Sequence, residues 1–282
     1  KKLRDHIDQP TLPTRTLALR QRTVSEIEMT VTRLSWPRAE AYLGDLLYHA
    51  GRLAEAEKLL RKSLAAEPGL DIANISLGLV LAQKKSFAEA KSYLEKAIAG
   101  DPANHLAYFN YAYCLSRESM DEGGNVSQFP PEAADRMRAA LRRAIEINPG
   151  FAESYRLLAF IALVDNTGLD EAAGLLHKGL SLRPGDEHFK LVLAQVLLRQ
   201  QKYDEAGTLA EKLAAAASDA DIWAGARSVI HPVDQFRAAT AAKADDAEVT
   251  KIFGPLPPLI LKRSTLSDDE VARFEEDRIV NN

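Results

Sequence analysis

The sequence has little cysteine and no long apolar run, and each shortage excludes a class of protein. Its 282 residues include one cysteine, which excludes an intrachain disulfide framework and a zinc site built from cysteines. No apolar run approaches the roughly 18 residues that a membrane-spanning helix needs, so we expect no membrane insertion. The formal net charge is -4, from 36 basic and 40 acidic residues. Such mild acidity argues against a nucleic-acid partner.

Motifs that carry catalysis or bind cofactors are also missing. None of the six histidines belongs to a His-Glu-x-x-His motif or to an i,i+4 metal-binding pair. The sequence has no Gly-x-Gly-x-x-Gly and no Walker motif. Cys114 lies in an apolar stretch, where a buried thiol acting as a small hydrophobe is favoured over a nucleophile. We therefore predict that the chain is not an enzyme and holds no cofactor or metal.

The strongest positive feature is an internal repeat of 34 residues. Leu43-Gly44 is followed 34 residues later by Leu77-Gly78, and Ala56 is followed by Ala90. Prolines close successive units at Pro68, Pro102, Pro149 and Pro184. The interval between the second and third of these prolines is 47 residues, so the third unit carries 13 extra residues. Five units fill residues 37–220.

Each unit has the pattern of two helices separated by a turn. In the first unit, Leu43, Leu46 and Leu47 share one face of the first helix, and we expect this face to pack in the core. Small residues recur where two antiparallel helices must approach closely. They are Gly44, Gly78, Ala112, Ala159 and Ala194 in the first helices, Ala56, Ala90, Ala172 and Ala206 early in the second helices, and Ala97, Ala144 and Gly179 near their ends. Neither helix can bury its apolar stripe alone, so the units are expected to stack.

This pattern resembles the tetratricopeptide repeat family over about two thirds of the chain. The resemblance implies an all-α fold, a right-handed α-α superhelix with helical caps, whose first helices line a concave groove that binds a protein or peptide. The third unit departs from the family pattern, because Met137 occupies the usual alanine position. A shorter similarity, in residues 3–13, is to large bacterial proteins in which a metallopeptidase-like domain precedes the repeats.

The flanks of the repeats are expected to be separate elements. Residues 1–36 are predicted to form an arm and a capping helix, and residues 221–250 to form C-terminal capping helices with a break at His231-Pro232. Residues 251–282 combine an apolar, proline-rich extended segment with a final helix. Within the third unit, residues 121–129 are polar and glycine-rich, and we interpret them as a loop whose replacement would barely change stability.

The stripe of the first helices that faces away from the core defines the candidate groove. Its residues are Ile72, Ile75, Leu79, Phe109, Tyr113, Arg117, Arg156, Phe160, Gln195 and Arg199. An exposed stripe of this size usually marks an interaction surface. The alternative is that flanking segments cover the stripe and make it part of the core.

Some members of the resembled family bind carboxylates through a clamp of Lys, Asn and Arg side chains on three successive first helices. The matching positions in the first three units hold Ala41, Asp45, Ser76, Leu106 and Asn110. The cations of that clamp are absent, so a carboxylate has nothing to pair with there.

Together these features predict a scaffold that binds a protein or peptide partner by burying its apolar side chains in the groove. A second candidate occupant is the chain's own segment 252–261, docked within one chain or in a neighbour's groove to make a homodimer. The alternative function is a non-catalytic accessory domain of a larger, metallopeptidase-like hydrolase.

Overall fold

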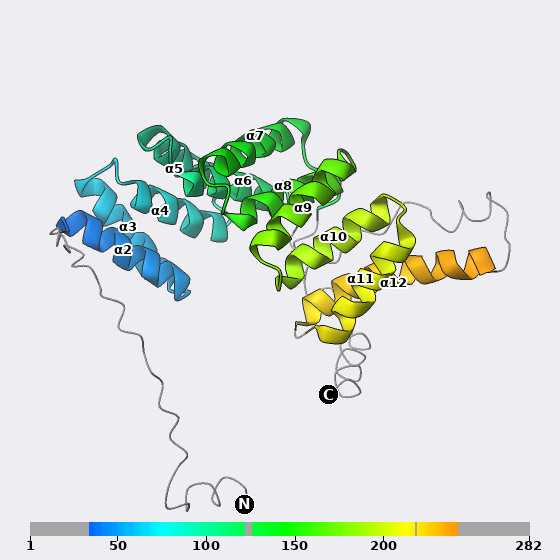
Figure 1. Ribbon diagram of the computed structural model, residues 1–282. Helices are drawn as coiled ribbons and strands as arrows, with labels where there is room; N and C mark the ends of the chain where they lie inside the picture. The colour runs from blue at the N-terminus through cyan, green and yellow to red at the C-terminus, as the bar shows by residue number, and fades with distance from the viewer. Residues whose placement is uncertain (1–33, 122–125, 218, 242–282) are drawn as a thin grey trace, which may run out of the picture. The chain divides into compact units, whose positions relative to one another are not determined.

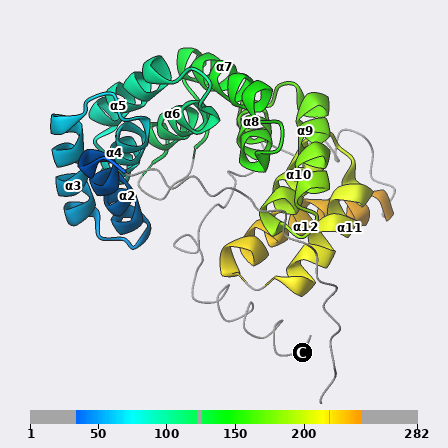
Figure 2. The same cartoon turned by 60° about the vertical axis from the view of Figure 1, so that its left-hand side comes forward.

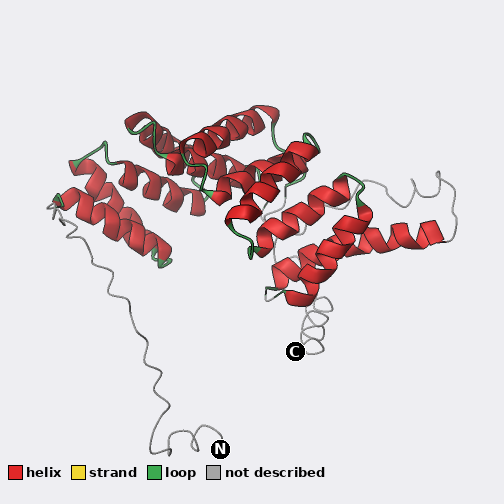
Figure 3. Ribbon diagram, viewed as in Figure 1, coloured by secondary structure: helices red, strands yellow, loops and turns green. Residues whose placement is uncertain are grey.

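A computed structural model describes residues 34–121, 126–217 and 219–241, and these residues form eleven α-helices joined by short loops (Figures 1 and 3). The helices are α2 (Trp36–His49), α3 (Leu53–Ala66), α4 (Asp71–Gln83), α5 (Phe87–Gly100), α6 (His105–Glu118), α7 (Pro131–Ile147), α8 (Ala152–Asp165), α9 (Leu169–Leu182), α10 (Glu187–Arg199), α11 (Tyr203–Ala216) and α12 (Ala220–Ala241). None of these described helices is both long enough and apolar enough to cross a membrane.

The helices pack in consecutive antiparallel pairs, as in a tetratricopeptide repeat solenoid. The pairs are α2–α3, α4–α5, α6–α7, α8–α9 and α10–α11, and each second helix also contacts the first helix of the next pair. The first helices of neighbouring pairs pack together in α2–α4, α4–α6 and α8–α10. Helices α6 and α8 approach each other less closely, and this is the junction that follows the long third unit (Figure 2).

The helices cross so closely that glycine is required at the crossings, as the sequence predicts. A Cβ atom on Gly44 would lie 2.6 Å from Cγ of Leu60, and one on Gly78 would lie 2.7 Å from Cγ of Leu94. A Cβ on Gly179 would lie 1.9 Å from the buried ring of Phe189 in the next unit. Because real Cβ atoms do not approach other heavy atoms so closely, a side chain at these positions would push the helices apart.

The apolar face expected in the core of the first helix is instead largely exposed. Leu43 and Leu46 are 53% and 65% exposed, whereas Leu77 and Val80, one repeat later, are fully buried. The later pair is covered because α4 packs against α2 and α3. No preceding pair among the described residues covers α2. Most of the predicted arm and capping helix, residues 1–33, lies outside the described residues.

The insertion of the third unit is not a passive loop, and the sequence-based interpretation is wrong on this point. Residues 126–130 form no helix, but Val126 is 8% exposed and Phe129 is 2% exposed. The Phe129 ring packs edge-on against Phe160 of α8, with the ring centres 6.2 Å apart. Two apolar side chains in a polar stretch therefore anchor the insertion in the core.

The predicted helix break at His231-Pro232 is also wrong, because α12 runs from Ala220 through Pro232 to Ala241. Proline lacks the N–H that would bond the carbonyl of Ser228, which normally breaks or kinks a helix. Here the flanking Val229 and Val233 are buried in the contact with α10 and α11. Burial on both sides of the proline outweighs the lost hydrogen bond.

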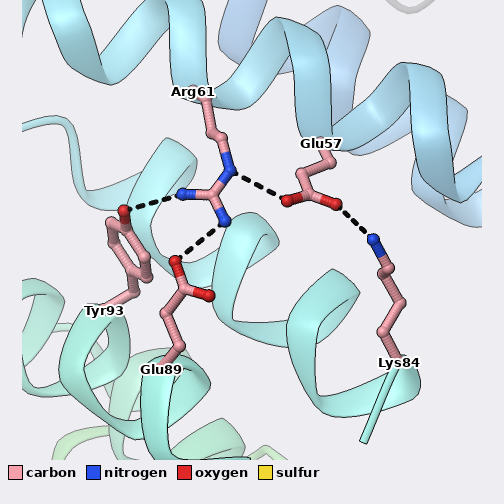
Figure 4. A network of polar contacts seen from close by, with 5 residues as sticks. All are labelled: Glu57, Arg61, Lys84, Glu89 and Tyr93. Carbon is pink, nitrogen blue, oxygen red and sulfur yellow. Dashed lines mark hydrogen bonds and ion pairs between the residues drawn. The ribbon is translucent and has the colours of Figure 1, made fainter. Parts of the chain in front are cut away.

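A polar network joins the first two units on the surface of the second helices (Figure 4). Arg61 of α3 donates to Glu57 and to Glu89 of α5, both at 2.8 Å, and to the hydroxyl of Tyr93 at 3.2 Å. Lys84 donates to the other oxygen of Glu57 at 2.7 Å. The bonds to Lys84 and then Arg61 lower the pKa of Glu57. The network orients α3 against α5, although exposed pairs contribute only about 0–1 kcal/mol each.

Candidate functional site

A pocket of about 250 Å³ lies among the first helices of the last three units and the start of α12. It is lined by Phe109, Tyr113, Ser116 and Met120 from α6 and the residues after it, Glu153, Arg156, Leu157 and Phe160 from α8, His188, Leu191, Val192 and Gln195 from α10, and Asp219, Asp221 and Ile222 around the start of α12. The pocket therefore opens where α6 and α8 are less closely packed than the other first helices.

Aromatic side chains form one wall of the pocket. The rings of Phe109 and Tyr113 stack with their centres 6.3 Å apart, and Phe151 meets Phe109 edge-on at 5.0 Å. Phe160 forms the neighbouring part of the wall and is held from behind by Phe129. Tyr113 is 38% exposed, which is high for an aromatic residue next to an apolar cavity. The wall is therefore packed against other rings at its base and accessible at Tyr113.

Arg156 brings a positive charge to this apolar pocket. Its guanidinium carbon lies 5.9 Å from the centre of the Phe189 ring, and it makes no hydrogen bond or ion pair with any part of the chain that the structure describes. Desolvation lowers the pKa of Arg156, although Asp186 and Glu153 nearby act in the opposite direction. Arginine remains protonated despite such a shift.

Gln195 is a second polar group without a partner. Its side chain is 2% exposed and lines the pocket, yet neither its amide nitrogen nor its amide oxygen has a hydrogen-bond partner among the described residues. An unsatisfied buried polar group costs about 1–3 kcal/mol. Both polar atoms of the Gln195 amide are therefore open to a hydrogen bond from a molecule outside the described residues.

Three carboxylates border the same pocket, namely those of Glu153, Asp219 and Asp221. Glu153 Oε1 pairs with Arg183 Nη1 at 2.5 Å. Asp219 accepts a hydrogen bond of 2.7 Å from the backbone N–H of Asp221 at the start of α12, where the helix dipole favours negative charge. Glu153 is thus engaged by Arg183, and Asp219 by the first turn of α12.

Of the ten residues predicted to line a groove, the structure brings five together in this pocket, namely Phe109, Tyr113, Arg156, Phe160 and Gln195. The other five are Ile72, Ile75, Leu79, Arg117 and Arg199. The three on α4 pack with the core of the first units, and Arg199 ends α10. Arg117 contacts the sulfur of Met120 at 3.8 Å and so touches the pocket indirectly.

Sequence reasoning missed the contribution of α12 to the pocket. Ile222 lies 34 residues after His188, which lines the pocket from α10, so extending the repeat by one more first helix would have found it. It also missed Met120, whose place depends on the path of the insertion. Cys114 lies outside the pocket and is buried, and desolvation raises the pKa of its thiol to about 11, as a structural cysteine requires.

Comparison with known proteins identifies the family. Family models described as tetratricopeptide repeat match residues 32–71, 73–104 and 163–229. The chain is therefore a tetratricopeptide repeat protein, and such domains generally act as scaffolds for protein–protein interaction and are typically non-catalytic. Nothing in these matches supports the similarity to proteins with a metallopeptidase-like domain. No curated protein matches the chain.

Solved structures from bacteria share the fold. PilF of Pseudomonas aeruginosa is 19% identical with a TM-score of 0.58, and the match covers 86% of this chain and 97% of that one. A thermophilic tetratricopeptide repeat protein of Thermus thermophilus is 21% identical with a TM-score of 0.54, covering 69% and 98%. MamA of Desulfovibrio magneticus is 15% identical with a TM-score of 0.51, covering 62% and 92%. At these identities the likeness concerns the fold alone.

Proposed function

We propose that the chain binds a peptide segment of a partner protein in the pocket between α6, α8, α10 and α12. The observation that carries this proposal is that aromatic side chains from two successive first helices, Phe109, Tyr113 and Phe160, line one cavity. Aromatic residues that close on a partner's side chain are the commonest centres of binding energy in protein interfaces. A preformed cavity also avoids the cost of ordering a loop on binding.

The test is affinity selection from a soluble library of short peptides with free termini, read by mass spectrometry. We expect the native chain to enrich peptides with apolar side chains. Replacing both pocket aromatics (Phe109→Ala with Tyr113→Ala) should weaken binding of an enriched peptide by at least about 2 kcal/mol. The matched control is Tyr42→Ala, an aromatic side chain that is 49% exposed and lies outside the pocket.

Circular dichroism separates binding from folding in this test. A double variant that keeps the helical signal but loses the peptide supports the proposal. A double variant that unfolds would assign these side chains to the core instead. A native chain that enriches no peptide, or a Tyr42→Ala variant that loses binding equally, would refute the pocket as the binding site.

The chain's own segment 252–261 is proposed as an internal competitor for the pocket. It lies outside the described residues, but its reach can be calculated. Helix α12 starts at the pocket and its 22 residues extend about 33 Å. The ten residues 242–251 span at most about 33–36 Å when extended, so the segment can return to the pocket. Deleting residues 251–282 should then raise the affinity of the chain for an external peptide. If the segment docks in a neighbouring chain instead, the deletion should convert a dimer to monomers. Unchanged affinity and mass would remove the segment from the proposal.

A further inference from the structure

We propose that two copies of the chain pair through α2, in antiparallel orientation, along an apolar stripe made of Trp36, Ala39, Leu43 and Leu46. This set of residues is called the α2 stripe below. The proposal is independent of the proposed function, because none of the four residues lines the pocket. It adds an interaction surface on the first helix pair, whereas the pocket lies among the last three units.

The α2 stripe occupies a face that is buried one repeat later. Trp36, Leu43 and Leu46 are 73%, 53% and 65% exposed. The residues 34 positions further on are all buried where α4 packs against α3, namely Leu70, Ala73, Leu77 and Val80. On α2 the same face has the composition of a helix contact, but no described helix lies on it. Such an exposed apolar patch is typical of an interaction surface.

A second copy cannot cover the α2 stripe by extending the stack of helices head to tail. In that arrangement a second helix of one copy would lie on α2 of the other. Each described second helix already packs against the following first helix, from α3 with α4 to α11 with α12. The last described helix, α12, presents a stripe of exposed polar residues, namely Arg227, His231, Asp234 and Gln235. Neither surface matches an apolar stripe.

The matching surface on a second copy is its own α2. Four of the eight large apolar side chains that are exposed in the described part of the chain lie on this helix, namely Trp36, Tyr42, Leu43 and Leu46. A contact between two identical faces is closed by two-fold symmetry, so it forms a dimer and does not propagate into a filament.

The spacing of the α2 stripe makes it complementary to itself. Its residues are separated by three, four and three positions, which is the spacing of a coiled-coil seam. Because these intervals have the same order in both directions, an antiparallel copy presents matching positions. Trp36 then lies opposite Leu46 of the partner subunit, and Ala39 lies opposite Leu43 of the partner subunit. The second pair joins a small side chain to a large one, which lets the two helices approach closely.

The exposed area predicts a weak dimer. An aromatic side chain buries roughly 150–250 Å². At their exposures of 73% and 49%, Trp36 and the neighbouring Tyr42 offer roughly 200–300 Å² together, to which Leu43 and Leu46 add. This area is below the roughly 800 Å² per partner of a standard interface. We therefore expect a dissociation constant of about 1 μM or weaker.

Sedimentation equilibrium of the full chain, from about 5 to 500 μM, measures this association. We expect a monomer–dimer equilibrium whose dissociation constant rises at least about tenfold in Leu43→Glu, because the variant places a charge in an apolar seam. The matched control is Leu182→Glu, since Leu182 is 40% exposed at the end of α9, far in sequence from the α2 stripe. It should leave the dissociation constant unchanged. Circular dichroism checks that both variants keep the helical signal.

Disulfide cross-linking tests the antiparallel register and needs no charged variant. Chains with Ala39→Cys and chains with Leu43→Cys are mixed and oxidised, while the native Cys114 is buried and does not compete. Residue 39 lies opposite residue 43 in the proposed register, within the reach of a disulfide. The mixed disulfide should therefore exceed its statistical share when intact masses are compared. A parallel pairing would enrich the two same-variant disulfides instead, and this result would overturn the proposal.

The remaining outcomes separate this dimer from the other proposals. A full chain that stays monomeric at about 500 μM overturns the pairing through α2, whatever else covers the stripe. Equal weakening by Leu43→Glu and Leu182→Glu overturns it as well. A dimer that is lost on deletion of residues 251–282 but persists in Leu43→Glu would assign the association to the C-terminal segment and overturn the pairing. Peptide binding by Leu43→Glu should match that of the native chain, so failure of the dimer leaves the proposed function intact.

Discussion

Removing the ring of Phe129 tests whether the insertion of the third unit is part of the core. The side chain is 2% exposed and packs against Phe160, which belongs to the pocket wall. A buried Phe→Ala change costs about 3–5 kcal/mol through lost transfer energy and the cavity left behind. For a folded region of about 200 residues, each kcal/mol lowers the melting temperature by roughly 2–4 °C. We therefore expect Phe129→Ala to melt about 6–20 °C below the native chain.

Thermal unfolding followed by circular dichroism measures this effect. The matched control is Gln128→Ala, because Gln128 is the adjacent residue and is exposed. It should stay within about 0.5 kcal/mol of the native chain. Because Phe129 holds Phe160 from behind, the variant should also weaken peptide binding below its melting transition. A melting temperature within a degree or two of the native value would refute the anchoring role and restore the interpretation of the insertion as a passive loop.

The remaining predictions concern a helix crossing and the response to pH. Gly179→Ala should destabilise the chain by about 3 kcal/mol, since its Cβ would lie 1.9 Å from the buried Phe189 ring. The control is Gly174→Ala on the same helix, where no atom lies within 4 Å of the new Cβ, and it should stabilise the chain by up to about 1 kcal/mol. Denaturant titration measures both variants, and a Gly174→Ala chain less stable than Gly179→Ala would contradict the packing argument. Burial lowers the pKa of His105 below its ordinary value of 6.5, and the ring nitrogen Nε2 accepts from Asn148 Nδ2 at 3.1 Å, a bond that protonation would break. The unfolded chain therefore binds this proton more readily than the folded chain. The contribution of His105 to stability should be complete above pH 6.5 and fall as the pH drops below it. In urea titrations at several pH values, His105→Gln should remove this contribution to the pH dependence of the unfolding free energy.

The two unpaired groups at the pocket also bear on the stability of the free chain. Gln195 buries an amide whose two polar atoms have no partner among the described residues, and Arg156 holds its charge in a desolvated position. Both arrangements cost folding free energy. Functional sites commonly keep such a cost, because the unmade contacts are available to a ligand. A substitution of Gln195 by Leu that raises the melting temperature of the free chain would show this cost directly.

The repeated helix pairs could be predicted from the sequence because they depend on contacts that recur at a fixed spacing. Gly44 meets Leu60 and Gly78 meets Leu94 in the same geometry, so a 34-residue shift of the sequence reveals both the pairs and their crossings. Half of the predicted groove residues line the pocket. They could be named from the sequence because the outward stripe of each first helix follows from the helical period once its core face is known.

Only the tertiary structure decided which surfaces meet across units. Phe129 lies in a polar, glycine-rich stretch, so composition predicts a loop, yet the space next to Phe160 buries it. Pro232 predicts a helix end from local sterics, yet burial of its neighbours against α10 and α11 keeps α12 continuous. Local propensity amounts to a few kcal/mol at most, and burial of several apolar side chains exceeds it. The pocket itself exists because α6 and α8 pack less closely after the insertion, and no spacing within a single helix encodes that separation.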